Sequence, residues 1–176
     1  WDDIEEMMRE IKSPEDFQAE VSAPAFKVIA QRTTNGLTFT NMDRIEKDQA
    51  YLFLSNHRDI ILDSALLNVS LLEKGYQTTQ IAIGDNLLQN SVIEDLVRLN
   101  KSFIVHRNIN PKEFLFFSKR LSHYIRKTVC EDNTSVWIAH KEGRSKDGDD
   151  RTASGLLKML ISSTKLEIEV ALRGLN

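Results

Sequence analysis

A histidine and two carboxylates follow the first buried strand that the sequence predicts. The apolar run Ala50–Leu54 is typical of such a strand, and the polar segment after it contains His57, Asp59 and Asp63. A carboxylate beside an imidazole fixes its tautomer and stabilises the imidazolium that forms when the histidine removes a proton. The spacing therefore predicts a general base at His57, paired with one of the two carboxylates. The alternative is that His57 caps the following helix or makes a structural hydrogen bond and that the carboxylates are solvated.

Cations follow two later strands in the same way. Arg107 comes directly after the predicted strand 102–105, where its forked guanidinium would suit a phosphate oxygen. The predicted strand 135–139 leads into a loop that holds Gly143, Arg144, Ser145 and Lys146. Glycine lets backbone N–H groups approach an anion, and the cations add charge. These segments indicate an anion site. The alternatives are that Arg107 is an ordinary surface residue or pairs with a local acid such as Glu94, and that the loop around Gly143 is a solvated, charged turn.

Other chemistries lack their sequence signatures. The four histidines show no HExxH or other metal-ligand spacing, so we expect no metal. Serine hydrolases place their nucleophile in a Gly-x-Ser-x-Gly turn. Residues 143–147 begin as that motif does, but Asp147 replaces its second glycine. The chain has neither a Walker A loop nor a Gly-x-Gly-x-x-Gly segment. The remaining pattern indicates a general base that faces an anionic substrate.

Strands alternating with helices must hold these side chains in place. The sequence predicts strands at 50–54, 79–83, 102–105 and 135–139, a short strand at 37–40, and helices at 60–72, 88–99, 111–129 and 155–161. This alternation indicates an α/β fold with a mixed, largely parallel sheet flanked by helices. In such sheets ligands bind where the strands have their carboxyl ends.

Two regions follow from the same patterns. Residues 1–33 predict an N-terminal helical segment whose apolar stripe is interrupted at Pro24. Residues 34–176 predict the α/β domain, which we expect to be incomplete at its C-terminus.

Composition excludes several classes of protein. The chain has 176 residues with 23 Lys+Arg against 26 Asp+Glu, a net charge of −3, so no basic excess indicates a nucleic-acid partner. A single cysteine, Cys130, precludes an intramolecular disulfide and favours a reducing compartment. No segment approaches the ~18 apolar residues that a membrane-spanning helix needs. We therefore expect a soluble or peripheral protein of the cytoplasm.

Three segments resemble, in order, the motifs of the glycerolipid acyltransferases. The first motif of that family, NHxxxxD, resembles Phe53–Ser64 (FLSNHRDIILDS). The second combines a Gly-x-Asn segment with a later strand that ends in Arg, and it resembles IAIGDNLL followed by SFIVHRN. The third, EGxRS, resembles KEGRSKDG. A fourth, VP-type motif is not found. Five residues instead of four separate His57 from Asp63, and one residue is missing between Gly143 and Arg144. The extra residue would rotate a helical side chain by ~100°, so Asp63 would need a local backbone adjustment to serve as the partner.

The resemblance implies a mechanism and its substrates. His57, oriented by Asp63 with Asp59 as the rival, would deprotonate a hydroxyl of glycerol-3-phosphate or 1-acylglycerol-3-phosphate. The oxygen would then attack the thioester of acyl-CoA or acyl-carrier protein, with no cofactor beyond this donor. The acceptor phosphate would be held by Arg107, Gly143, Arg144, Ser145 and Lys146.

Such acceptors imply membrane contact, and we expect a peripheral protein at the inner face of the cell membrane. One candidate surface consists of Phe114, Phe116, Phe117, Lys119 and Arg120. The alternative is that these aromatic residues form a core-facing stripe with solvated cations on the other side.

Three other functions stay open at this point. The acceptor could be another lysolipid. The chain could be a non-catalytic lipid- or phosphate-binding domain of the same fold, which the altered spacing at Asp63 favours. A phosphate-handling hydrolase would need a nucleophile or a metal site that the sequence does not show.

Overall fold

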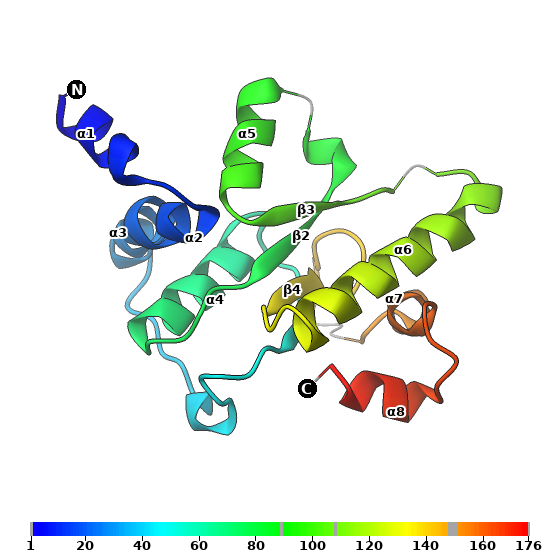
Figure 1. The fold of residues 1–176 in the computed structure, drawn as a ribbon. Coiled ribbons are helices and arrows are strands. Elements are labelled where there is room, and N and C mark those ends of the chain that lie inside the picture. The colour runs from blue at the N-terminus through cyan, green and yellow to red at the C-terminus, as the bar shows by residue number, and fades with distance from the viewer. Residues whose placement is uncertain (1, 89, 108, 148–150, 176) are drawn as a thin grey trace.

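A four-stranded sheet lies at the centre of the computed structural model, which describes residues 2–88, 90–107, 109–147 and 151–175. The strands lie in the order β1-β4-β2-β3, and every neighbouring pair is parallel. They are β1 (Leu52–Ser55), β2 (Gln80–Gly84), β3 (Ser102–Val105) and β4 (Val136–Ala139). Helices flank this sheet, which confirms the predicted α/β class (Figure 1).

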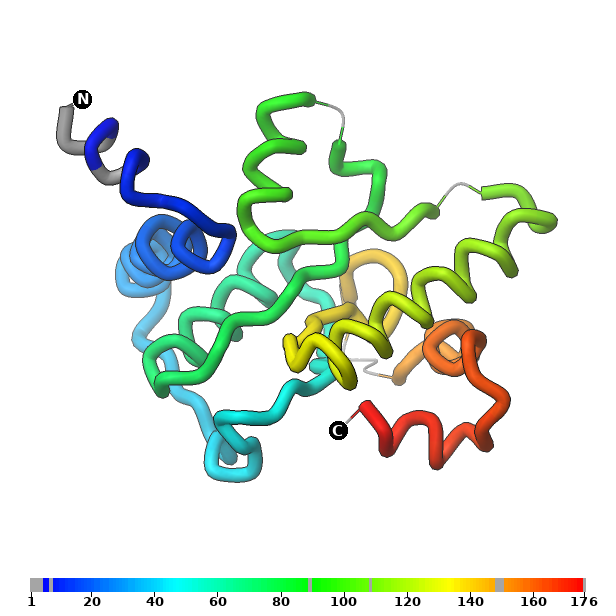
Figure 2. The backbone as a smooth tube through the Cα atoms, viewed as in Figure 1, coloured from blue at the N-terminus to red at the C-terminus, as the bar shows by residue number. Residues whose placement is uncertain are grey.

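The predicted strand at 37–40 is wrong. This segment pairs with no other strand of the described chain and runs irregularly from the N-terminal helices toward β1, as the tube in Figure 2 shows. Its alternating Thr and apolar residues have the period of a strand, but strand geometry persists only where a partner supplies hydrogen bonds.

The helices that follow the strands are α4 (Leu62–Glu73), α5 (Ser91–Leu99), α6 (Pro111–Cys130), α7 (Ser154–Ile161) and α8 (Ile168–Arg173). Two of them, α5 and α6, begin at an asparagine whose side chain caps the helix. The side chain of Asn90 accepts a hydrogen bond from the N–H of Val92, and that of Asn110 accepts from two N–H groups of the first turn of α6. Such caps satisfy backbone donors that the helix itself leaves unpaired.

The main core lies between the sheet and α6 to α8. Ile125 and Val129 of α6 pack with Val136 and Ile138 of β4 and with Leu160 of α7, and all five are buried. Figure 1 shows α6, α7 and α8 together on one side of the molecule. The first six residues of α6, in contrast, are exposed. The core-facing alternative for the aromatic residues is therefore wrong for Phe114 and Phe116.

The N-terminal helices pack on the α/β part. They are α1 (Asp2–Glu10), α2 (Pro14–Phe17) and α3 (Ala23–Thr33), with a π-helical turn at Gln18–Ser22. The wider turn comes just before Pro24, which lacks an N–H and crowds the preceding turn of an α-helix, so the helical run continues past the proline. The buried amide of Gln18 donates to the carbonyls of Thr79 and Asn100. The boundary near residue 33 stays a prediction.

Candidate active site

Parallel strand order brings four polar segments to one edge of the sheet, which we call the strand-exit rim. His57 follows β1, the loop with Arg144 follows β4, Asp85 follows β2, and Arg107 follows β3. Neighbouring strands lie ~4.8 Å apart, so the four exits fall within about 15 Å of one another. The β4 loop comes last in the sequence but lies between the β1 and β2 exits in space.

His57 and Asp63 are in direct contact at this rim. Nδ1 of His57 lies 2.9 Å from Oδ2 of Asp63, and the same oxygen accepts the backbone N–H groups of Arg58 at 2.7 Å and Asp59 at 3.0 Å. An ionised carboxylate can only accept, so Nδ1 carries the hydrogen, and in the neutral form of this tautomer the lone pair is on Nε2. The pair can therefore present an oriented base.

Asp59 has a different place. Its Oδ1 accepts the N–H groups of Ile61 and Leu62, both at 2.9 Å, at the start of α4. The N–H of Leu62, and then that of Ile61, hold the pKa of the Asp59 carboxyl below its usual value, and the nearby charges of Arg144 and His57 act in the same direction. The alternative in which His57 caps this helix is wrong, because Asp59 makes those bonds.

The extra residue between His57 and Asp63 is taken up before the helix begins. Helix α4 starts at Leu62, and the residues from Asp59 to Ile61 form a bend and a turn before it. A rotation of ~100° per residue applies only within a helix. The turn is thus the local adjustment that brings Asp63 to the imidazole.

Trp137 supports His57 from the neighbouring strand. The two rings meet edge to face with centroids 6.0 Å apart, and the indole is only 4% exposed. The indole Nε1–H donates to Oγ of Ser55 at 2.9 Å, which orients the ring. Sequence reasoning assigned Trp137 only to a strand. The signal for its role was a Trp within an apolar run, because a buried indole N–H needs a hydrogen-bond acceptor nearby.

The loop after β4 is joined to the first exit through its backbone. The N–H of Ser145 donates to the carbonyl of His57 at 2.6 Å, while the hydroxyl of Ser145 donates to the carbonyl of Asp147 at 3.1 Å. Gly143 has a φ of +73°, a left-handed conformation that favours glycine. Arg144 and Lys146 are exposed beside this junction. The predicted cations therefore lie next to the His57 segment.

Arg107 joins the β3 exit to the same loop. Its Nη1 lies 3.7 Å from Oε1 of Glu142, so Arg107 does pair with an acid, as the alternative interpretation allowed, but that acid is Glu142 and not Glu94. Glu94 pairs instead with Arg98 at 2.6 Å, one helical turn further along α5. Glu142, which sequence reasoning did not single out, thus connects the second and third motif segments.

Gly84 makes room for the Arg107 guanidinium. A Cβ at position 84 would lie 2.8 Å from Cζ of Arg107 and would overlap its Nε and Oδ1 of Asn86. Gly84 ends β2, and Asp85 accepts from the His106 ring at 3.2 Å. The sequence alone identified Gly84 only as part of a motif. A glycine at the end of a strand was the signal that another group, here the Arg107 side chain, comes close to the backbone.

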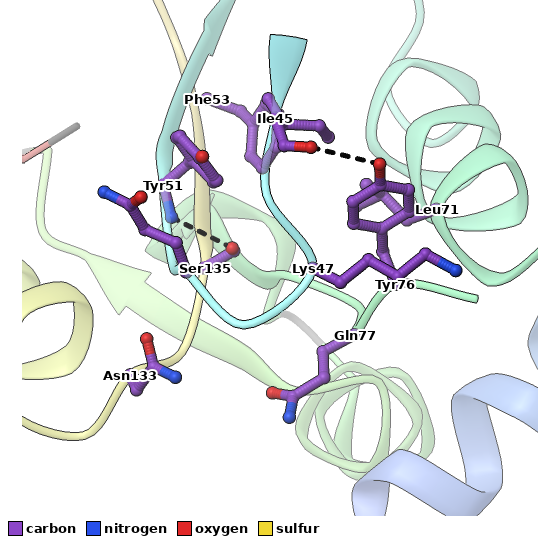
Figure 3. A pocket seen from close by; sticks show the side chains of 10 residues that line it. Ile45, Lys47, Tyr51, Phe53, Leu71, Tyr76, Gln77, Asn133 and Ser135 are labelled. Carbon is purple, nitrogen blue, oxygen red and sulfur yellow. Dashed lines mark hydrogen bonds between the residues drawn. The ribbon is translucent and has the colours of Figure 1, made fainter. Parts of the chain in front are cut away.

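The hollow in Figure 3 lies elsewhere. Tyr51, Phe53 and Ser135 line it at the amino ends of β1 and β4, opposite the strand-exit rim. Tyr76 closes one side by donating to the carbonyl of Ile45. Across the described ranges of the chain, no group of three or more His, Cys, Asp or Glu side chains is placed to hold a metal ion.

Comparison with known proteins identifies one family. A family model described as Acyltransferase matches residues 36–168, which is more than half of the chain and includes all four strand exits. The comparison with curated proteins gives no match.

Proposed function

The chain belongs to the acyltransferase family, and from that premise we propose that it moves a fatty acyl group from acyl-CoA or acyl-carrier protein to a hydroxyl of glycerol-3-phosphate or 1-acylglycerol-3-phosphate. This reaction would serve phospholipid synthesis and would use no cofactor beyond the donor. The observation that supports it most is the contact of His57 with Asp63 at a rim that also carries Arg107 and Arg144.

In the proposed mechanism the imidazole moves one proton twice. Nε2 of His57 takes the proton of the acceptor hydroxyl as the oxygen attacks the thioester carbonyl. Asp63 stabilises the imidazolium through the Nδ1 hydrogen bond. When the C–S bond breaks, the imidazolium returns its proton to the departing thiolate, so the products are an ester and a free thiol.

The cations would position the acceptor. Arg107, Arg144 and Lys146 would bind its phosphate and so hold the hydroxyl beside His57. Gly143 and Ser145 would act through the loop backbone, because the Ser145 N–H is bonded to the carbonyl of His57. The His57–Asp63 contact supports catalysis over the non-catalytic alternative, which the altered spacing had favoured.

We further propose that the protein works as a peripheral protein at the inner face of the cell membrane, because acceptors with long acyl chains stay in the bilayer. In the part of the chain that the structure describes, none of the helices has the length and apolar character needed to cross a membrane.

Release of free thiol from palmitoyl-CoA, followed with a chromogenic disulfide, tests the proposed function. The assay is run without acceptor, with glycerol-3-phosphate and with 1-acylglycerol-3-phosphate, and is repeated with an acyl-carrier-protein donor. We expect release that depends on one of the two acceptors. Release without any acceptor would indicate a thioesterase, and no release under any condition would favour a binding domain.

Replacing Arg144 by alanine is expected to raise the acceptor KM by about 10- to 100-fold and to change kcat much less, because a charge-assisted contact to phosphate is made before and during the reaction. Initial rates over a range of acceptor concentrations measure both constants. Lys165→Ala removes an exposed cation after α7, away from the rim, and serves as the control. An equal rise in KM in both variants would argue against a specific phosphate contact.

Gly84→Ala is expected to raise the acceptor KM by roughly tenfold, because the new methyl group must displace the Arg107 guanidinium. Gly155→Ala is the matched control, since no atom lies within 4 Å of a Cβ at that position. The same kinetic assay compares the two variants. An unchanged KM in Gly84→Ala would mean that the position of Arg107 has no part in acceptor binding.

A further inference from the structure

The contact with Asp63 holds the imidazole of His57 at one atom. Nδ1 lies 2.9 Å from Oδ2 of Asp63, and the two side chains are mostly buried, with exposed fractions of 14% and 18%. A single hydrogen bond tolerates a broad range of angles, so the ring can still tilt about that contact. The direction of Nε2, on the far side of the ring, therefore depends on what packs against the imidazole.

The indole of Trp137 packs against this ring. The two ring planes meet at 64° with their centroids 6.0 Å apart. Trp137 lies in β4, which pairs with β1 on one side and β2 on the other, so its backbone is held from both sides. Val136 and Ile138 face the main core, and side chains alternate along a strand, so the indole projects from the opposite face of the sheet. It is a fixed surface beside the imidazole.

A hydrogen bond also fixes the indole itself. Its Nε1–H donates to Oγ of Ser55 at 2.9 Å, and the hydroxyl of Ser55 donates to the carbonyl of Asn56 at 3.1 Å. The hydroxyl thus spends its one hydrogen on the backbone and offers a lone pair to the indole. Ser55 ends β1, two residues before His57. The strand that leads to the histidine therefore also holds the ring that packs against it.

We propose that Trp137 is a positioning residue for His57: the indole, held by Ser55, sets the tilt of the imidazole about its bond to Asp63 and so directs Nε2 toward the acceptor hydroxyl. This inference rests on the proposed function, which assigns the proton transfer to Nε2. Catalytic groups must be held within about 0.5 Å and 10–20° of the productive geometry, which one hydrogen bond does not achieve. A second contact from another strand supplies the missing constraint.

Trp137→Phe tests the proposal, because phenylalanine keeps an aromatic ring in β4 but is smaller and has no N–H for Ser55. We expect kcat to fall about tenfold and the acceptor KM to stay within about twofold, because a misdirected base slows the reaction without weakening phosphate binding. Circular dichroism and thermal unfolding check that the variant folds. Ser55→Ala keeps the indole and removes its acceptor, and it should lower kcat about threefold with the same unchanged KM.

Phe103→Leu is the matched control. Phe103 lies in β3, packs against the main core and pairs with the ring of Tyr124 at a centroid distance of 5.1 Å. Its replacement also removes an aromatic ring from the sheet, so it should lower thermal stability and leave kcat unchanged. An equal loss of kcat in Phe103→Leu and Trp137→Phe would overturn the proposal, because general loosening of the sheet would then explain both.

A double variant separates action through His57 from other effects. In His57→Ala protein, adding Trp137→Phe should not lower the residual rate further, because no imidazole is left to position. A further loss of about tenfold in that background would overturn the proposal, since the indole would then act on another part of the site.

Nuclear magnetic relaxation of the ring C–H groups in ¹³C-labelled protein measures the order of the imidazole without any turnover. His57→Ala identifies the His57 signals among those of the four histidines. We expect a rigid His57 ring in wild type and in Phe103→Leu, and a lower order parameter in Trp137→Phe, where the smaller side chain leaves room for the ring to tilt. An unchanged order parameter in Trp137→Phe would overturn the proposal.

The outcome is separable from that of the proposed function. A lower order parameter in Trp137→Phe, together with no thiol release by wild type, would leave the positioning of the imidazole standing and refute the acyltransferase reaction. Acceptor-dependent thiol release with the same kcat in wild type and Trp137→Phe would refute the positioning role alone.

Discussion

Replacing His57 by alanine is expected to lower kcat by about 10²- to 10⁴-fold, which is the usual contribution of a positioned general base. The loss should fall on kcat, because the imidazole accepts the hydroxyl proton in the transition state and does not bind the acceptor's phosphate. Acceptor-dependent release of thiol from the donor, with acceptor at saturation, measures it.

The fold should survive this change. Oδ2 of Asp63 keeps its hydrogen bonds from the N–H groups of Arg58 and Asp59 when the imidazole is gone, so the carboxylate is not left unpaired. His123→Ala, on the exposed side of α6, is the matched control and should keep full activity. A His57→Ala protein with the kcat of wild type would exclude His57 as the base.

Replacing Asp63 by asparagine is expected to lower kcat by about 10²- to 10⁴-fold, because the amide has no charge to stabilise the imidazolium and can donate to Nδ1, which selects the wrong tautomer. The shape of the side chain is retained, so the turn before α4 should persist. The kinetic assay gives kcat, and thermal unfolding shows whether stability has changed.

Asp59→Asn is the decisive control for this prediction. Asparagine caps helices about as well as aspartate, so the bonds to Ile61 and Leu62 should remain and kcat should stay within about threefold of wild type. A large loss in Asp59→Asn with little effect of Asp63→Asn would reverse the two assignments. Large losses in both would show that the charge around His57 matters more than the single contact.

Local patterns in the sequence account for the elements. The apolar runs before His57, Arg107 and His140 are short and bounded by polar residues, and each forms a strand. Pro111 marks a helix start where the structure has it, whereas the helix predicted from residue 88 begins at Ser91. These features follow from backbone geometry and side-chain periodicity over a few residues, so they could be predicted without knowledge of the rest of the chain.

The same local reasoning fails where a contact with a distant segment decides. Residues 37–40 have the period of a strand but lack a partner. The aromatic residues at the start of α6 have the spacing of a core-facing stripe, yet the helix extends past the layer that would cover them. Periodicity states which side chains share a face, and only packing decides whether that face is covered.

The sequence by itself determined the α/β class, the strand exits and the residue types that gather there: one imidazole, its carboxylates and a set of cations. Only the tertiary structure decided which of them touch. Strand order inserts the β4 loop between the first two exits, the turn before α4 brings Asp63 to His57 and leaves Asp59 as a cap, and Gly84 gives Arg107 its place. The physical reason is that periodicity acts over one or two turns of regular chain, whereas these contacts depend on the irregular turn before α4 and on which distant strands pair, as Leu52 does with Val136.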